Sequence, residues 1–220
     1  MSTTEIERQC QTAYTKNHDT SLTYFQPDKA PPEDKKSFEF DKVYAGTAEQ
    51  GNAQDGVFGD LKNLILSCVE GRNVCIFAYG QTGAGKTFSM VGADGSIGGN
   101  IAMDASTPTP LPNAGVTPRA IVELFSVLEE REALNIGEVD TSMYELYCDS
   151  LVDLLNPKSK EKLNIKLAQH TDSGLVEVEG GTVKRTSTMQ ELMDAMEKGI
   201  KVRAGIECRL SFFAHVAIPN

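Results

Sequence analysis

The octapeptide GQTGAGKT at residues 80–87 constrains this chain more than any other feature. Three of its residues are glycines, which adopt backbone angles that other residues avoid, so the chain can turn tightly here. An apolar, partly β-branched run, NVCIFAY at residues 73–79, leads into it. We expect that run to be a strand buried on both faces, and a helix to follow the loop. The predicted local order is therefore strand, glycine-rich loop and helix.

The spacing of the octapeptide matches the phosphate-binding loop G-x-x-x-x-G-K-[ST], or P-loop. Its glycines allow consecutive backbone N–H groups to converge on an anion, supported by the N-terminus of the next helix. Lys86 is expected to reach the β- and γ-phosphates of a nucleoside triphosphate, and the Thr87 hydroxyl to bind Mg²⁺. The predicted nucleotide-binding residues are Gly80, Gln81, Thr82, Gly83, Ala84, Gly85, Lys86, Thr87 and Phe88, with Thr87 as the metal ligand.

The base is expected to be adenine. Guanine-specific enzymes of the Ras type read their base with an Asn-Lys-x-Asp tetrapeptide, and this chain has none. We therefore predict ATP with Mg²⁺ as the bound cofactor.

Composition narrows the choice of partners and compartment. A hydrophobic content of 40% over 220 residues is enough for one domain with a sizeable core. The formal charge of −10 repels phosphate backbones and anionic lipid headgroups, so we expect no nucleic-acid and no membrane partner. The five cysteines never occur as Cys-x-x-Cys, the N-terminus is polar, and no long apolar run occurs. These features predict a soluble, cytoplasmic protein with reduced thiols.

Three amphipathic helices follow from apolar residues at helical spacing. The first has an apolar face that runs from Val57 to Cys68, the second is capped by Thr117, and Thr188 with Glu191 forms a capping box for the third. Between the first two helices, residues 92–113 are rich in Gly, Pro, Ser and Thr and predict a long exposed loop. Residues 1–34 are polar without a sustained period, and we expect them to be loosely ordered.

Other segments of the sequence predict strands. SFEFDKV at residues 37–43 alternates as a half-buried strand does, and residues 139–157 predict a strand followed by a turn of helix. Extended pieces at residues 163–167 and 175–184 predict a small β-meander. Asp149 and Asp153 are expected to be surface or helix-end carboxylates rather than catalytic acids.

The longer string IFAYGQTGAGKTFSM, residues 76–90, resembles the kinesin motor signature. The resemblance continues in FEFDKVYAGTAEQ from Phe38, in GVTPRAIVELF from Gly115 and in YELYCDSLVDLL from Tyr144, and it covers residues 38–205. It looks most like the C-terminal-motor branch, in particular its plant calmodulin-binding type. The expected organisation is a loosely ordered segment at 1–34, a partial kinesin motor domain at 35–205 and a divergent tail at 206–220.

The resemblance implies an α/β P-loop NTPase with a central sheet flanked by helices. It also implies an ATPase that couples hydrolysis to movement along microtubules, and hence a cytoskeletal location. Phe88 would lie near adenine, with a core position in the helix as the alternative. Lys158, Lys160, Lys162 and Lys166 fall where kinesins place a loop on the microtubule face, but a solvated lysine-rich turn is the favoured interpretation of these residues.

Two features of the family are absent from this sequence. Residues 1–32 contain no Arg-x-Arg-Pro, and no Asn-x-x-Ser-Ser-Arg-Ser-His or Asp-x-x-Gly-Ser-Glu switch sequence follows Arg203. We therefore expect an incomplete sheet and a truncated or mis-spliced product, and we assign no catalytic residue. A non-hydrolysing ATP-binding or microtubule-interacting module is the main alternative to a motor ATPase. A small nucleotide or metabolite kinase is disfavoured, because the P-loop begins at residue 80 and arginines are few.

Overall fold

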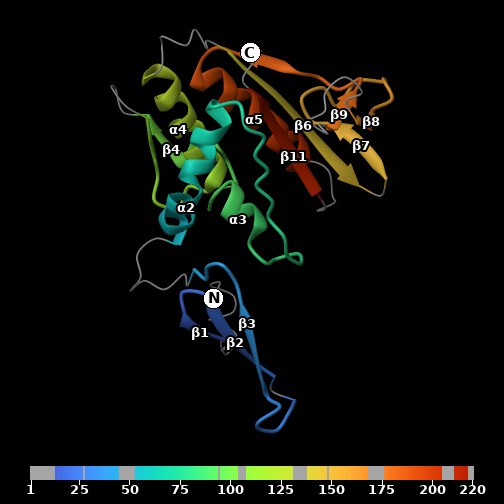
Figure 1. The fold of residues 1–220 in the computed structure, drawn as a ribbon. Coiled ribbons are helices and arrows are strands. Elements are labelled where there is room, and N and C mark those ends of the chain that lie inside the picture. Colours follow the sequence, from blue (N-terminus) through green and yellow to red (C-terminus); the bar gives the residue numbers. More distant parts are fainter. Residues whose placement is uncertain are drawn as a thin grey trace. The chain divides into compact units, whose positions relative to one another are not determined.

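The computed structural model describes residues 13–26, 28–44, 53–93, 95–103, 108–130, 138–147, 149–167, 176–204 and 211–217. The chain divides into two compact units, Met1–Val57 and Phe58–Asn220. Figure 1 shows the fold as a ribbon. In the described part of the chain, no helix is both long and apolar enough to cross a lipid bilayer.

The first unit contains a three-stranded antiparallel sheet in the order β1-β2-β3. Its strands are β1 (Tyr14–His18), β2 (Ser21–Phe25) and β3 (Lys35–Glu39). The rings of Tyr14 and Tyr24 lie opposite each other with centroids 5.2 Å apart. The hydroxyl of Thr23 accepts a hydrogen bond from Asn17 and contacts the hydroxyl of Ser37, so the three strands share a polar network.

Two predictions about this unit need correction. Loose order at residues 1–34 is wrong for residues 14–25, because their threonines and aromatic residues favour strands and the polar side chains bond one another across the sheet. The strand expected at residues 37–43 forms at Lys35–Glu39, but it is exposed along its length, with 44% of Phe38 accessible. Residues 1–12 lie outside the described residues.

The helices are α2 (Ala53–Val69), α3 (Lys86–Met90), α4 (Val116–Glu130) and α5 (Met189–Ala204), with a short 3₁₀ helix η2 (Gly98–Asn100). The three amphipathic helices predicted from spacing are confirmed as α2, α4 and α5. The predicted capping box forms in part: the amide of Glu191 donates to the Thr188 hydroxyl, but the Glu191 carboxylate accepts the amide of Ser187 rather than that of the N-cap residue Thr188. Apolar residues of these helices and of β6 build one core, which includes Ile65, Val69, Ile121, Leu124, Phe125, Val139, Met143, Leu192 and Met196.

The larger sheet has the order β10-β6-β11, with β7 also paired to β6. Its strands are β6 (Val139–Tyr147), β7 (Ser150–Asp153), β10 (Lys184–Thr186) and β11 (Ser211–Ala217), all antiparallel to β6. Two hairpins accompany it: β4 (Ile101–Met103) with β5 (Pro108–Pro110), and β8 (Asn164–Leu167) with β9 (Val176–Glu179). Helix α5 packs on β6, where Gly199 leaves room for the Met143 side chain. Figure 1 shows α5 beside the long β6 and β11 strands.

Three strand predictions differ from the structure. Residues 150–153 form β7 rather than a turn of helix, because Asp149 takes a left-handed φ of 63° and reverses the chain into a hairpin with β6. The β-meander is a hairpin of β8 and β9, since residues 184–186 pair with β6 instead. Residues 211–217 of the expected tail pair along β6 as β11, while 205–210 and 218–220 lie outside the described residues.

The run NVCIFAY at residues 73–79 is not a buried strand. It is extended, with accessibility that alternates residue by residue: Ile76 packs on the core, whereas Phe77 is 72% and Tyr79 is 91% exposed. Its backbone makes no hydrogen bond to another described residue. A strand needs neighbours that accept and donate main-chain bonds, and none lies beside this run in the described part of the chain.

Candidate nucleotide-binding site

The predicted P-loop residues lie together in one turn between the extended run and α3. Gly83 and Gly85 have φ angles of 85° and 90°, in the left-handed region that glycine adopts without strain. The amide of Ala84 donates to the carbonyl of Gln81 at 3.1 Å, which closes the turn. The two left-handed glycines change the direction of successive peptide units, as in the backbone concavities that bind anions.

Lys86, the first residue of α3, folds back over this turn. Its ammonium nitrogen donates hydrogen bonds to the carbonyl oxygens of Gly80 and Gln81, at 2.7 and 2.8 Å. No described carboxylate pairs with it. The loop therefore holds a positive charge that only neutral carbonyl groups offset.

Thr87 and Phe88 follow on α3. Thr87 is exposed, and its carbonyl accepts the amide of Val91 at 2.7 Å, which fixes the helical turn that carries the side chain. Phe88 is 45% exposed, so it is not a core residue of the helix. This accessibility argues against the alternative of a core position.

In the described part of the chain, the loop carries unpaired hydrogen-bond donors and a positive charge. The amides of Gly83, Gly85, Lys86 and Thr87 donate to no acceptor among the described residues. Four unused amide donors, one ammonium group and one exposed hydroxyl suit an anionic polyphosphate and a hard cation. A left-handed glycine turn with Lys and Thr at the start of a helix is the arrangement of the P-loop class of nucleotide-binding proteins.

The segment between α3 and α4 holds α3 in place, and sequence reasoning missed this role. Ile97 is completely buried, and the buried amide of Asn100 donates to the carbonyls of Val91, at 3.3 Å, and of Ser96. Arg119 of α4 donates to the carbonyls of Ala114, Leu111 and Pro112. The long exposed loop expected at residues 92–113 is therefore wrong for its middle, because buried polar side chains satisfy its backbone. Residues 94 and 104–107 lie outside the described residues.

Asp153 is a second residue whose role the sequence did not reveal. It is buried, and its carboxylate accepts the amides of Leu155, Asn156 and Thr182 at 2.8 to 3.0 Å. The expectation of a surface or helix-end carboxylate is wrong for Asp153, although it holds for exposed Asp149. The three amide bonds occupy the Asp153 oxygens and give the residue a structural task.

The comparisons with known proteins agree with the P-loop class. A family model for the kinesin motor domain matches residues 1–211. Kinesin-like protein KIN-14E of Arabidopsis thaliana is 38% identical over 161 residues, which cover 73% of this chain and 11% of that protein. Kinesin-like protein KIN-14F of Oryza sativa subsp. japonica is 36% identical over 185 residues, or 84% of this chain and 16% of that protein.

A solved structure gives the same answer for the fold. It is that of a fast kinesin, interpreted for its ATPase mechanism and its interactions with microtubules, and it superposes with a TM-score of 0.70 and 26% identity. The match covers 92% of this chain and 50% of that one. The chain belongs to the kinesin motor-domain family, and the α/β P-loop NTPase fold predicted from its sequence is confirmed. The relatives of the KIN-14 type agree with the predicted resemblance to C-terminal motors.

Proposed function

We propose that this chain is the nucleotide-binding part of a kinesin-type motor that binds Mg·ATP and couples its hydrolysis to movement along microtubules. The observation that carries the proposal is the P-loop, a single turn that contains the Lys86 ammonium and four backbone amides without an acceptor among the described residues. The chain spans less than a fifth of the length of the KIN-14 relatives and half of the solved kinesin, so motor activity is proposed for the protein as a whole.

Each group of the loop has a proposed task toward the nucleotide. The amides of residues 83–87 hold the phosphate oxygens, and Lys86 exchanges its two carbonyl acceptors for the β- and γ-phosphates. The Thr87 hydroxyl would hold Mg²⁺, which supplies charge neutralisation of the phosphates when bound. Phe88, with nearly half of its surface accessible, offers a face to adenine.

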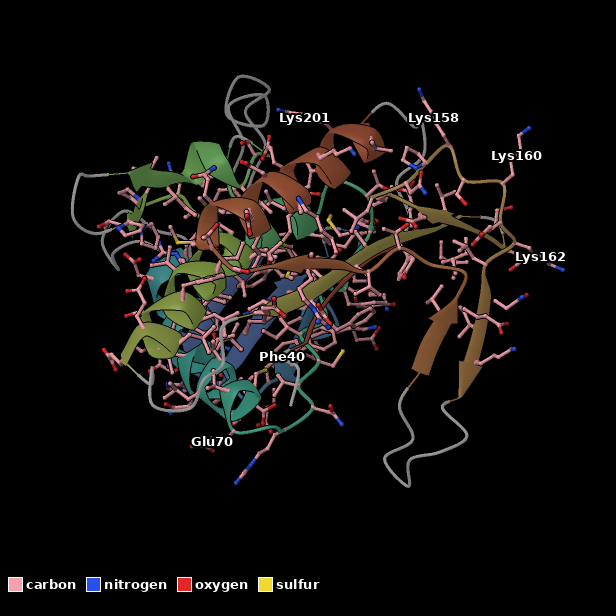
Figure 2. All side chains as sticks on the ribbon, turned by 90° about the horizontal axis from the view of Figure 1, so that it is seen from above. Phe40, Glu70, Lys158, Lys160, Lys162 and Lys201 are labelled. Carbon is pink, nitrogen blue, oxygen red and sulfur yellow. The ribbon has the colours of Figure 1, made fainter. Side chains whose placement is uncertain are left out.

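The proposed microtubule contact is the lysine-rich segment between β7 and β8. Figure 2 shows the side chains of Lys158, Lys160 and Lys162 extending outward from this segment. Lys166 differs, because its ammonium pairs with Glu179 at 2.5 Å. A chain with a net charge of −10 can meet an acidic filament only through a local basic patch of this kind. The proposed place of action is the microtubule cytoskeleton of the cytoplasm.

A non-hydrolysing ATP-binding module is the second candidate. It is favoured by the surroundings of Lys86, which bonds only to backbone carbonyls and to no described carboxylate. Phosphoryl transfer to water requires groups that orient the water and stabilise the transition state, and no described residue is assigned to this task. Nucleotide would then hold a conformation without turnover.

Steady-state ATPase assays with and without microtubules, together with equilibrium Mg·ATP affinity, separate the two candidates. A motor ATPase binds Mg·ATP and turns over faster when microtubules are added. Tight binding without turnover selects the non-hydrolysing module. The absence of both binding and turnover contradicts both candidates.

A further inference from the structure

The carboxylate of Glu197 on α5 accepts hydrogen bonds from the segment that follows α3. Oε2 of Glu197 accepts the backbone amide of Ile97 at 2.8 Å and the hydroxyl of Ser96 at 3.0 Å. The Glu197 side chain is only 20% exposed, and its other oxygen lies 3.6 Å from the ammonium of Lys201. Hydrogen bonds to an ionised acceptor in such a partly buried position are stronger than neutral ones.

Residues 96–100, which follow α3, are held by burial and by hydrogen bonds. Ile97 is completely buried. The amide of Gly99 donates to the Ser96 hydroxyl at 3.0 Å, at the start of the 3₁₀ helix η2. Asn100 at the end of η2 is also buried, and its side-chain amide donates to the carbonyls of Ser96 and of Val91. Hydrogen bonds thus connect Glu197 to Val91 through Ser96 and Asn100.

Val91 is the C-cap residue that follows the last residue of α3, Met90. Its amide donates to the carbonyl of Thr87 at 2.7 Å, and its own carbonyl accepts the amide of Gly115 at 3.2 Å. Gly115 sits so close that an added Cβ would lie 2.6 Å from the Val91 amide nitrogen. Because α3 has only five residues, a shift at Val91 reaches Thr87 within one helical turn.

We infer that Glu197 is a positioning residue for the P-loop helix, acting through Ser96, Ile97 and Asn100 on Val91. For nucleotide the inference rests on the proposed function: loss of this link loosens the turn that carries Lys86 and Thr87 and speeds nucleotide release. The order of α3 itself does not depend on that proposal, so the two can be tested apart.

The matched variants are Glu197→Ala, Glu197→Gln and Asp194→Asn. Alanine removes both acceptor bonds, whereas glutamine keeps an oxygen that can accept them and should restore the link. Asp194→Asn removes one negative charge from the exposed side of the same helix, where Gln190 is the one hydrogen-bond partner of Asp194 among the described residues. Ser96→Ala removes one of the two bonds to Glu197, together with the bond from the Gly99 amide, and leaves α5 unchanged; it is the alternative variant if Glu197→Ala fails to fold.

Hydrogen exchange of the nucleotide-free protein tests the link directly. The amides of Ser89 and Val91, which close the turns of α3, should exchange about tenfold faster in Glu197→Ala, because that variant removes both bonds to the segment. Glu197→Gln should lie within about twofold of wild type, Ser96→Ala in between, and Asp194→Asn should not differ. Equal exchange in Glu197→Ala and Asp194→Asn would overturn the inference, and so would an equal rise at Leu124 and Phe125 in α4, since that marks global loosening.

Release of a fluorescent ADP analogue in the presence of Mg²⁺ provides the second readout. Glu197→Ala should release it about tenfold faster than wild type and Glu197→Gln should restore the rate. An unchanged rate in a chain that binds the analogue overturns the inference. If wild type binds no analogue, the proposed function fails while the exchange experiment still decides whether Glu197 positions α3.

Discussion

The ammonium group of Lys86 lies 2.7 Å from the carbonyl oxygen of Gly80, six residues earlier in the chain. With a second bond to Gln81, it closes the P-loop on itself. A phosphate oxygen that binds Lys86 would replace one or both carbonyl acceptors or use the third N–H of the ammonium, and it offers an anionic acceptor in place of a neutral one. The exchange is favourable because hydrogen bonds between charged partners are the stronger kind.

Replacement of Lys86 by alanine should reduce the affinity for Mg·ATP by about 100-fold or more, since bonds to a charged group contribute roughly 1.5–3 kcal/mol each. Displacement of a fluorescent nucleotide measures the loss. The melting temperature should stay close to that of wild type, because Lys86 contacts loop carbonyls rather than the core. Lys158→Ala, which removes an exposed lysine of the β7–β8 segment, is the matched control and should leave the affinity unchanged. Similar affinity in both variants would show that Lys86 does not face the phosphates.

The magnesium dependence of ATP binding should require the hydroxyl group of Thr87. Thr87→Val keeps the shape of the side chain and removes the hydroxyl, so affinity for Mg·ATP should fall by about tenfold, the effect of one lost metal or hydrogen-bond contact. In excess EDTA the variant and wild type should bind ATP equally. Titrations with and without the chelator measure both affinities. A Thr87→Val affinity that remains as magnesium-dependent as that of wild type would place the metal elsewhere.

Replacing a left-handed glycine of the loop by alanine should lower the stability of the fold because of its backbone angles, without any steric clash. An added Cβ at Gly85 meets no atom within 4 Å, but φ is 90°, so alanine should cost roughly 1–2 kcal/mol of folding free energy. Gly98 is equally open and has no positive φ, and alanine there should be neutral or stabilising by up to about 1 kcal/mol. Urea denaturation of the pair measures the difference. Equal stabilities would contradict the loop conformation.

The buried carboxylate of Asp153 should be important for stability. In wild type the carboxylate accepts three backbone N–H groups, whereas asparagine would point its NH₂ group at one of them. Asp153→Asn should therefore lower the free energy of unfolding by roughly 3 kcal/mol. Asp149→Asn is the same chemical change at an exposed residue with φ of 63°, a conformation that asparagine tolerates. It should stay within about 0.5 kcal/mol of wild type in chemical denaturation. Comparable losses in both variants would remove the structural role from Asp153.

The ion pair between Asp140 of β6 and Arg185 of β10 should make the stability of the fold depend on pH. Arg185 donates to both carboxylate oxygens of Asp140, at 2.8 and 3.0 Å, and this lowers the pKa of Asp140 below its ordinary value of 3.8. A lowered folded-state pKa means that the stabilisation is complete above pH 3.8 and is lost as pH falls through the folded value. Wild type should therefore be more stable than Asp140→Asn at pH 7, and the gap should close in acid. Thermal melts across this range measure the gap, which high salt should reduce. A gap that widens in acid would contradict the pairing.

Local patterns in the sequence predicted the parts of the fold that depend on local forces. Helical spacing gave α2, α4 and α5, and the glycine spacing gave the turn at Gly83 and Gly85. The apolar run at 73–79 was predicted as a buried strand because its composition is that of one, yet burial requires neighbours on both edges. The tasks of Asp153 and Glu197 depend on amides 29 and 100 residues away, and no local pattern reports such a contact.

Isothermal titration calorimetry of the folded chain with Mg·ADP and Mg·ATP tests the central claim, that the turn between Gly80 and Thr87 is a polyphosphate site. The account predicts saturable heat with one nucleotide per chain, which disappears in Lys86→Ala. A wild-type titration without heat of binding for either nucleotide would contradict it.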